Sequence, residues 1–251
     1  MRKRHLLFLL LLLISTTLLF ILLLPTEEPA VRIAAWNLQV YGDAKASDPA
    51  LLAAYAGVIR RYDIVVLQEI RDADGSSIVA LCALLDGYAC NATSRAGRSS
   101  SKEQYVFAYR NATLLALDDH NPDPQDRWER PPARATFLVG NRTITLYAIH
   151  TKPTDAPREI RALQRLVEEE SPDGSVLVLG DLNADCAYYD PKREDAFDGW
   201  RWVIDEDTTT GRSDCAYDRI FSNTRYPAAG VDRMDITAAM SDHYPVWVGL
   251  T

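Results

Sequence analysis

Residues 176–186 read Val-Leu-Val-Leu-Gly-Asp-Leu-Asn-Ala-Asp-Cys. The four apolar residues at the start predict a β-strand that is buried on both faces, and Gly180 ends this run. Asp181 and Asn183 are two positions apart, so extended backbone would direct both side chains to the same side. A carboxylate and an amide there suit Mg²⁺ and a phosphate, because Mg²⁺ takes oxygen ligands and an amide can donate to a phosphoryl oxygen. On this segment alone, an Asx-rich turn explains the same residues equally well.

The composition is typical of a folded globular protein with an acidic balance. Of the 251 residues, 47% are hydrophobic and 25% are charged, and the net charge is -8. Without Arg2, Lys3 and Arg4, the chain has 24 basic and 35 acidic residues, a net charge of -11. This balance argues against tight, nonspecific binding of nucleic acid. It leaves open an enzyme that handles a polyanion through a divalent cation and a local basic strip.

The N-terminus has the pattern of a targeting segment. Basic residues at 2–5 precede Leu6 to Leu24, which are 19 residues without a charge and long enough to span a bilayer. Residues 25–30 form a linker that lacks a small-x-small cleavage site. We therefore expect residues 1–24 to be an uncleaved signal anchor in the membrane, with a cleaved signal peptide as the alternative. Because basic residues keep their end inside, residues 31–251 would lie at the cell surface or be secreted.

Residues 31–251 mix strand and helix patterns without a second linker, which predicts one domain. Apolar runs predict strands at 31–37, 63–69, 103–109, 114–117, 134–139, 143–150, 176–179, 217–221 and 244–250. Helices are expected at 49–59, with Asp48 as cap, at 76–85 and at 157–170. Residues 118–132 and the segment with Trp200 and Trp202 are expected to be loops. So many strands require stacked sheets, which indicates an α/β or α+β class.

Polar and mostly ionisable residues stand where the predicted strands begin or end. They are Asn37, Glu69, His150, Asp181, Asn183, Asp218, Asp242 and His243. A single polar residue at a strand end is weak evidence for a functional site, because every strand must end. The whole set has one consistent chemistry, and its two histidines have acids nearby, as a general acid/base pair requires.

Short motifs in order resemble the endonuclease/exonuclease/phosphatase superfamily. They are Trp36-Asn37, Gln68-Glu69, Gly180-Asp181-Leu182-Asn183 and Ser241-Asp242-His243. Four further stretches resemble its deoxyribonuclease I branch, namely residues 102–105, 183–186, 215–220 and 241–246. Each motif is weak alone, but the ordered series over residues 31–251 is specific. The resemblance implies a four-layer α/β sandwich with two packed central β-sheets.

The resemblance also implies a divalent metal site and a phosphate site. Glu69 would be the main metal-ligating carboxylate, with Asn37 beside it and Asp242 assisting. The cofactor would be Mg²⁺ or Mn²⁺. Asp181 and Asn183 would position the scissile phosphate and the attacking water.

Two histidines would exchange the protons of the reaction. By resemblance, His150 and His243 are the acid/base residues, Glu103 orients His150, and Asp218 orients His243. A carboxylate partner fixes the imidazole tautomer and stabilises its charged form. Phosphodiester hydrolysis needs this proton transfer together with charge neutralisation at the phosphate.

The DNA contacts implied by the resemblance are only partly present. Arg71 and Arg130 match arginines that contact DNA, but Ser101 stands where the family has a tyrosine that stacks in the minor groove. We therefore expect weaker duplex binding, since stacking contributes roughly 1–3 kcal/mol per base. The valines that hold actin in the mammalian enzyme are replaced by Ala89 and Cys90, so no actin binding is expected.

The four cysteines, Cys82, Cys90, Cys186 and Cys215, can pair in three ways, and an outside location allows disulfides. By resemblance, Cys186 pairs with Cys215, which leaves Cys82 to pair with Cys90. The first bridge would close a loop of about 30 residues, worth roughly 3 to 4 kcal/mol.

Two loops match structural calcium sites of the family. Asp207 and Thr209 match one loop, in which Gly211 replaces an oxygen-bearing side chain. Asp126 matches part of the other, where Pro131 replaces an acid. The sequence therefore predicts weaker structural Ca²⁺ sites than those of the family.

These expectations combine into a monomeric, outward-facing, metal-dependent DNA endonuclease. One alternative is another phosphoesterase of the superfamily, such as a sphingomyelinase-like or inositol phosphatase-like enzyme. Another is a non-catalytic DNA-binding surface protein, which the complete catalytic set and the acidic net charge disfavour.

Overall fold

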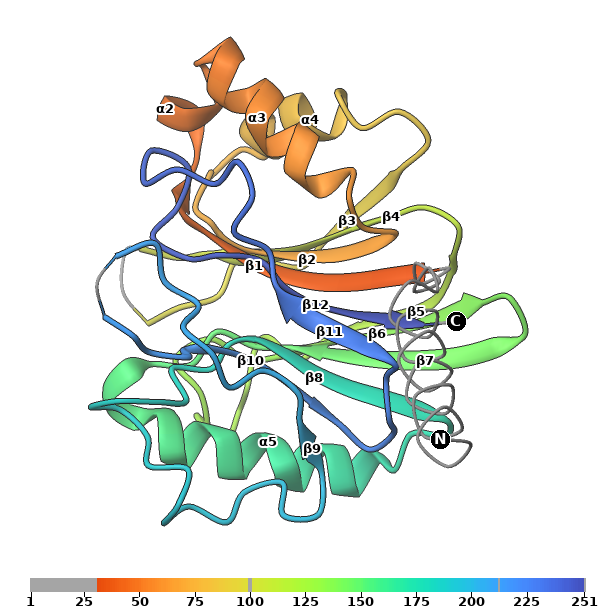
Figure 1. The fold of residues 1–251 in the computed structure, drawn as a ribbon, viewed down its shortest axis with the longest axis vertical. Coiled ribbons are helices and arrows are strands. Elements are labelled where there is room, and N and C mark those ends of the chain that lie inside the picture. The colour runs from red at the N-terminus through yellow and green to blue at the C-terminus, as the bar shows by residue number, and fades with distance from the viewer. Residues whose placement is uncertain (1–30, 99–100, 212, 251) are drawn as a thin grey trace, which may run out of the picture.

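The computed structural model describes residues 31–98, 101–211 and 213–250. Its strands form two six-stranded mixed sheets that pack face to face, with helices on both outer faces (Figure 1). This is the four-layer α/β sandwich that the motif series predicts. The expected anchor at 1–24 and the linker at 25–30 lie outside the described residues. In the described ranges, no helix combines the length and the apolar character that a bilayer span needs.

The first sheet has the strand order β11-β12-β1-β2-β4-β3. These strands are β11 (Ala228–Val231), β12 (Val246–Leu250), β1 (Val31–Tyr41), β2 (Ile64–Ile70), β4 (Gln104–Tyr109) and β3 (Ala89–Ala92). β1 and β2 are parallel, and the other neighbours are antiparallel. Its outer face is covered by α2 (Asp43–Ala46), α3 (Pro49–Ile59) and α4 (Ser76–Cys82) (Figure 1). The side chain of Asp48 caps α3 as predicted, because it accepts the N–H groups of Ala50 and Leu51.

The second sheet has the order β5-β6-β7-β8-β10-β9. Its strands are β5 (Thr113–Asp119), β6 (Ala133–Val139), β7 (Arg142–Ala148), β8 (Ser175–Asp181), β10 (Asp218–Ser222) and β9 (Arg201–Trp202). β7 and β8 are parallel, and α5 (Ala156–Glu170) crosses between them on the outer face (Figure 1). A single 3₁₀ turn, η1 (Pro153–Asp155), precedes α5.

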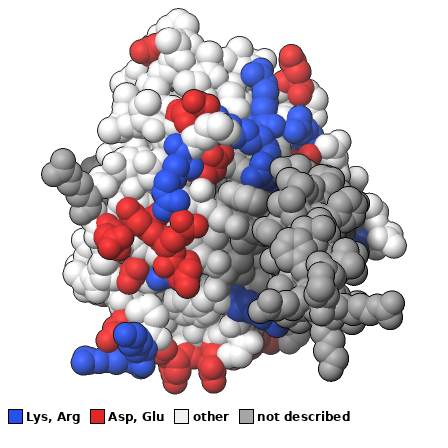
Figure 2. Space-filling view, in the orientation of Figure 1, with Lys and Arg blue, Asp and Glu red and all other residues white. Residues whose placement is uncertain are grey.

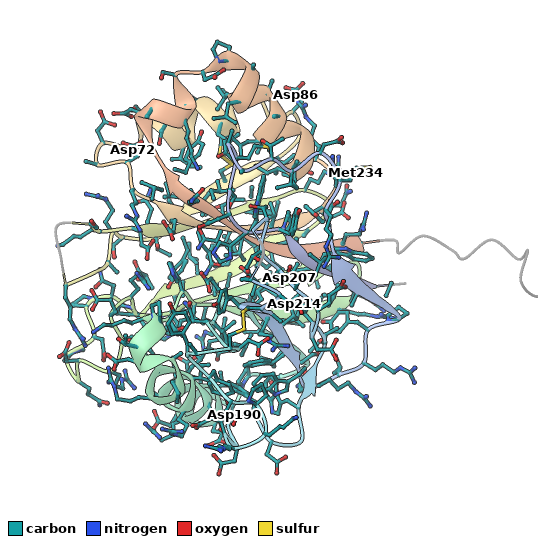
Figure 3. The ribbon with its side chains drawn as sticks, turned by 60° about the vertical axis from the view of Figure 1, so that its left-hand side comes forward. Asp72, Asp86, Asp190, Asp207, Asp214 and Met234 are labelled. Atoms are coloured by element: carbon teal, nitrogen blue, oxygen red, sulfur yellow. A yellow bond between two sulfur atoms is a disulfide. The ribbon has the colours of Figure 1, made fainter. Side chains whose placement is uncertain are left out.

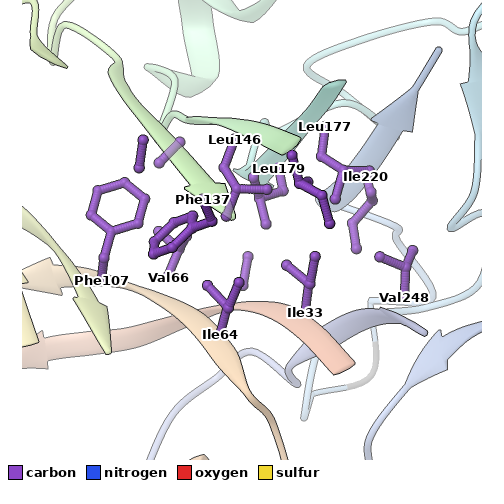
Figure 4. Close-up of a cluster of buried hydrophobic side chains, with 14 of the residues drawn as sticks. Ile33, Ile64, Val66, Phe107, Phe137, Leu146, Leu177, Leu179, Ile220 and Val248 are labelled. Carbon is purple, nitrogen blue, oxygen red and sulfur yellow. The ribbon is translucent and has the colours of Figure 1, made fainter. Parts of the chain in front are cut away.

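A continuous apolar core fills the space between the sheets (Figure 4). Ile33 and Ile64 of the first sheet face Leu177 and Leu179 of the second, and all four are fully buried. Val178, which points the other way, packs in the separate cluster beneath α5. Burial on both faces explains why the strand before Gly180 is a continuous apolar run without polar alternation.

Some elements differ from the sequence prediction. Trp202 lies in β9, whereas a loop was expected, and α2, β3 and β11 were not predicted. Each of these elements has two to four residues, which is too short to show a hydrophobic period. The helix predicted at 76–85 ends at Cys82, and β1 continues to Tyr41.

Both expected disulfides are present. Cys82–Cys90 joins α4 to the edge strand β3, and Cys186–Cys215 joins the loop after β8 to the segment before β10. The second bridge therefore connects two segments that adjoin predicted site residues, because Cys186 follows Asn183 and Cys215 precedes Asp218.

Candidate active site

The predicted site residues meet at one edge of the sandwich. β1 and β2 are parallel, so Asn37 and Glu69 come together near the ends of these strands, with an amide-to-carboxylate distance of 3.2 Å. β8 ends at the same edge, where the Asn37 Nδ2 donates to Asp181 Oδ2 at 3.0 Å. Asp218 pairs with Asp181 in the antiparallel register of β10 and β8. The carboxyl ends of β2 and β8 and the amino end of the antiparallel β10 thus meet at one site.

Five side chains form a line through this site. Glu103 Oε1 lies 3.0 Å from His150 Nδ1, and His150 Nε2 lies 3.5 Å from Asp181 Oδ2. On the other side, the same Asp181 oxygen lies 3.6 Å from His243 Nε2, and His243 Nδ1 lies 2.7 Å from Asp218 Oδ2. Each histidine therefore has its Nδ1 held by a carboxylate and its Nε2 directed toward the central Asp181.

The electrostatics of this line favour charged histidines. Burial alone would lower the pKa of His243, but Asp218 and Asp181 outweigh it and raise this pKa to about 10. Burial likewise opposes the charge of His150, and Glu103 raises the pKa of that imidazole above its usual value. Burial would raise the pKa of Asp181, but His243 and His150 lower it. These three groups stabilise one another in their charged forms, whereas burial raises the pKa of Asp218.

Glu69 and Asn37 offer oxygen atoms for a divalent cation. The Glu69 side chain is 13% exposed, so its carboxylate is reachable from solvent, and its Oε2 accepts the Val40 N–H at 2.9 Å. Asp242 is exposed beside His243, with its Oδ1 3.7 Å from His243 Nε2. Glu69, Glu103 and His150 also place one ligand atom each within 4.8 Å of one another. Carboxylate and amide oxygens of this kind fit Mg²⁺ or Mn²⁺.

A buried glutamine, Gln68, connects the two sheets at the site, and the sequence analysis assigned it no role of its own. Its Nε2 donates to the Ile149 carbonyl at 2.6 Å, and its Oε1 accepts the Asp181 N–H at 2.8 Å. Gly180 makes this approach feasible, because a Cβ at this position would lie 2.5 Å from Gln68 Nε2. The sequence signal that could have indicated this role is a polar residue within the otherwise apolar run of β2. Gln68 fixes β2 against the segments that carry His150 and Asp181.

The backbone at Asn183 differs from the prediction. β8 ends at Asp181, and Asn183 has a φ of 48°, so the pair does not share an extended segment and the argument from strand geometry is wrong. Instead, Asp181 Oδ1 accepts the Asn183 N–H at 3.1 Å, and Asn183 Nδ2 donates to the Thr151 carbonyl at 3.1 Å. An Asx-type turn and a polar site are therefore combined in the same residues.

Two arginines flank the Glu103 carboxylate. Arg130 Nε lies 2.6 Å from Glu103 Oε1 and also donates to the His150 carbonyl at 2.9 Å. Arg71 Nη2 forms a 2.8 Å ion pair with Glu69 Oε2. The predicted DNA-contacting arginines thus lie directly beside the predicted metal ligand and acid/base groups.

The acidic residues of the two predicted calcium loops bind groups of the protein itself. Asp126 is engaged by a guanidinium, because Arg98 Nη2 lies 2.7 Å from its Oδ1. In the other loop, the Thr209 hydroxyl donates to Asp207 Oδ1 at 2.9 Å. Figure 3 shows Asp207 in the same part of the molecule as Asp214. Among the described residues, neither Asp126 nor Asp207 belongs to a cluster of three or more acidic, cysteine or histidine ligand atoms, so the structural Ca²⁺ sites stay a prediction.

The surface charge is mixed. On the face shown in Figure 2, acidic side chains gather in a patch, and basic side chains form separate groups. Among the described residues visible on this face, the basic side chains do not form a continuous surface that would bind nucleic acid by charge alone.

The sandwich and the residues at its edge are those of a phosphoesterase class, and the comparisons with known proteins agree. The chain belongs to the endonuclease/exonuclease/phosphatase family, which it matches over residues 34–243. It is 32% identical to human deoxyribonuclease-1-like 2, over 88% of this chain and 92% of that protein. It is also 32% identical to bovine deoxyribonuclease-1, over 88% and 93% of the two chains. A solved family member from Leptotrichia buccalis has the same fold, with a TM-score of 0.69 at 17% identity, over 88% of this chain and all of the other.

Proposed function

We propose that this protein is a metal-dependent DNA endonuclease that hydrolyses phosphodiester bonds outside the cell. The observation that carries the proposal is the line Glu103–His150–Asp181–His243–Asp218, with two imidazole Nε2 atoms directed at one carboxylate. The similarity to two deoxyribonucleases supports DNA as the substrate.

The two histidines divide the proton transfers. One histidine, in its neutral form, takes a proton from the attacking water, and the other, in its charged form, gives a proton to the leaving oxygen, which typically contributes 10²–10⁴-fold in rate. Glu103 and Asp218 hold Nδ1 of each ring, so Nε2 is the atom that exchanges the proton. Asp181 lies between the rings and orients the water.

The phosphate is held by donors around this line. Asn183 uses one amide hydrogen on the Thr151 carbonyl, and its second hydrogen can reach a phosphoryl oxygen. Arg71 and Arg130 contact the DNA, with Arg71 as the main minor-groove contact. Glu69, with Asn37 and Asp242, holds Mg²⁺ or Mn²⁺, and this ion neutralises charge on the phosphoryl oxygens when it is bound.

We propose an extracellular location and a monomeric state. Two disulfides fit an oxidising compartment, and the N-terminal segment supplies either a membrane anchor or a secretion signal. No actin binding is expected. A structural Ca²⁺ stays a prediction, which the ion dependence of the assay below tests.

The test is digestion of supercoiled plasmid by the full chain in detergent, with Mg²⁺, Mn²⁺, Ca²⁺ or EDTA. We expect nicking with Mg²⁺ or Mn²⁺ and none with EDTA. His150→Ala and His243→Ala should each lower the rate by at least about 100-fold. The matched control is His120→Ala, since this histidine pairs with Glu170 away from the line. Near-wild-type cutting by either folded site variant would disprove the assignment, and hydrolysis of sphingomyelin or inositol phosphates in place of DNA would favour another phosphoesterase.

A further inference from the structure

Lys45 lies in the short helix α2 and belongs to none of the predicted site residues, yet its ammonium is fully engaged. It donates to the carbonyl oxygens of Leu38 and Met240, each at 2.7 Å, and to that of Gln39 at 2.5 Å. An ammonium has three N–H donors and no acceptor, so these three bonds use all of its donors. Lys45 is therefore not placed to bind a phosphate.

Two of the three carbonyls belong to a strained segment of β1. Gln39 and Val40 have φ values of 48° and 56°, in the left-handed region. This region is unfavourable for residues other than glycine, most of all for a β-branched residue such as Val40, and persists only where the surroundings hold it. Lys45 stabilises this conformation, because its ammonium donates to the carbonyl oxygens of Leu38 and Gln39 at the start of the turn.

The strained turn has a direct effect on the proposed metal ligands. It directs the Gln39 N–H to Asn37 Oδ1 at 2.9 Å and the Val40 N–H to Glu69 Oε2 at 2.9 Å. In extended backbone, the N–H groups of successive residues such as Gln39 and Val40 would point in opposite directions. The orientation of both oxygen-bearing side chains thus depends on the turn.

The third carbonyl belongs to the segment that carries the second histidine. Met240 is followed by Ser241, whose hydroxyl donates to the Asn37 carbonyl at 2.6 Å and accepts the His243 N–H at 3.0 Å. One ammonium therefore joins the strand end with the metal ligands to the segment with Asp242 and His243, which lies about 200 positions further along the chain.

We propose that Lys45 is a positioning residue that holds the 38–40 turn and the 240–243 segment in one arrangement, and thereby sets the affinity of the site for a divalent cation. This inference rests on the proposed function. Groups that orient metal ligands typically change metal affinity or activity by about 10- to 100-fold when they are removed.

The test compares the full chain with Lys45→Met, which keeps a long side chain but removes all three donors. The control is Lys192→Met, at an exposed lysine in the loop after β8. Calorimetry with Mn²⁺ and hydrogen exchange of the Gln39 and Val40 amides are measured on folded protein. We expect Lys45→Met to bind Mn²⁺ about 10- to 100-fold more weakly and to exchange these amides faster, while Lys192→Met matches wild type.

A purely structural role for Lys45 would lower the melting temperature and leave the Mn²⁺ affinity of the folded protein unchanged. Wild-type affinity and exchange rates in folded Lys45→Met would therefore overturn the proposal. If Lys45→Met does not fold, the comparison is made with Lys45→Gln, whose shorter side chain has two N–H donors in place of three. Neither the Mn²⁺ affinity nor the exchange rates require turnover. A wild-type protein that fails to cut DNA would disprove the proposed function, and the two measurements would still decide the role of Lys45.

Discussion

Replacement of Gly180 by alanine tests whether the site needs the close approach of β2 to β8. Gly180 has a φ of +136°, a conformation that is almost restricted to glycine. An added Cβ would overlap the Ile149 carbonyl oxygen and would lie 2.5 Å from Gln68 Nε2. The Gln68 side chain would have to leave its position between the sheets, and it would then lose its hydrogen bonds to Ile149 and Asp181.

The expected cost has two parts. The backbone conformation costs about 1–3 kcal/mol for a residue with a Cβ, and overpacking in a close-packed interior costs about 1–3 kcal/mol. Gly180→Ala should therefore lower the free energy of unfolding by about 2–6 kcal/mol. The DNA cleavage rate of the folded fraction should also fall by about 100-fold, because a displacement near 1 Å in reacting groups has that effect.

The assay is urea unfolding followed by plasmid cleavage under conditions in which the variant is folded. The matched control is Gly140→Ala, because Gly140 has a φ of +60° but nothing within 4 Å of an added Cβ. This control should lose only about 1–2 kcal/mol and keep its activity. Equal losses of stability in the two variants, with wild-type cleavage by Gly180→Ala, would refute the role assigned to the close approach.

Two further predictions concern pH and DNA binding. Burial opposes the charge of Asp72 (Figure 3), but hydrogen bonds from Ser77 and Asp74 outweigh it and lower the pKa of Asp72 from 3.8 to about 2. Its stabilising contribution is therefore present above pH 3.8 and is lost as the pH falls through 2, so Asp72→Asn should cost about 1–2 kcal/mol at neutral pH and progressively less in acid. Urea unfolding at several pH values measures this, and a difference that is independent of pH would contradict it. Ser101→Tyr should strengthen duplex binding by about 1–3 kcal/mol and make the cleavage ladder of an end-labelled duplex more uneven, whereas an unchanged ladder would show that this loop does not enter the groove.

The fold was predictable because central strands such as β2 and β8 are apolar on both faces. Leu177 enters the core between the sheets while Val178 packs beneath α5, so the strand gives an uninterrupted apolar signal that ends abruptly at Gly180. The ordered motifs at such strand ends then indicated the family. Edge elements such as β9 gave no signal, because a strand of two residues has no period to detect.

The sequence by itself determined which residue types gather at the strand ends, since strand exits and the ordered motifs are local patterns. Only the tertiary structure decided how these residues are held. Gln68 bonds partners 81 and 113 positions away, and Lys45 bonds a carbonyl 195 positions away. Such bonds depend on how two sheets pack and on left-handed turns at Val40 and Asn183, which no local pattern specifies. The physical reason is that a hydrogen bond requires a defined position of both groups, and that position exists only after the sheets have packed.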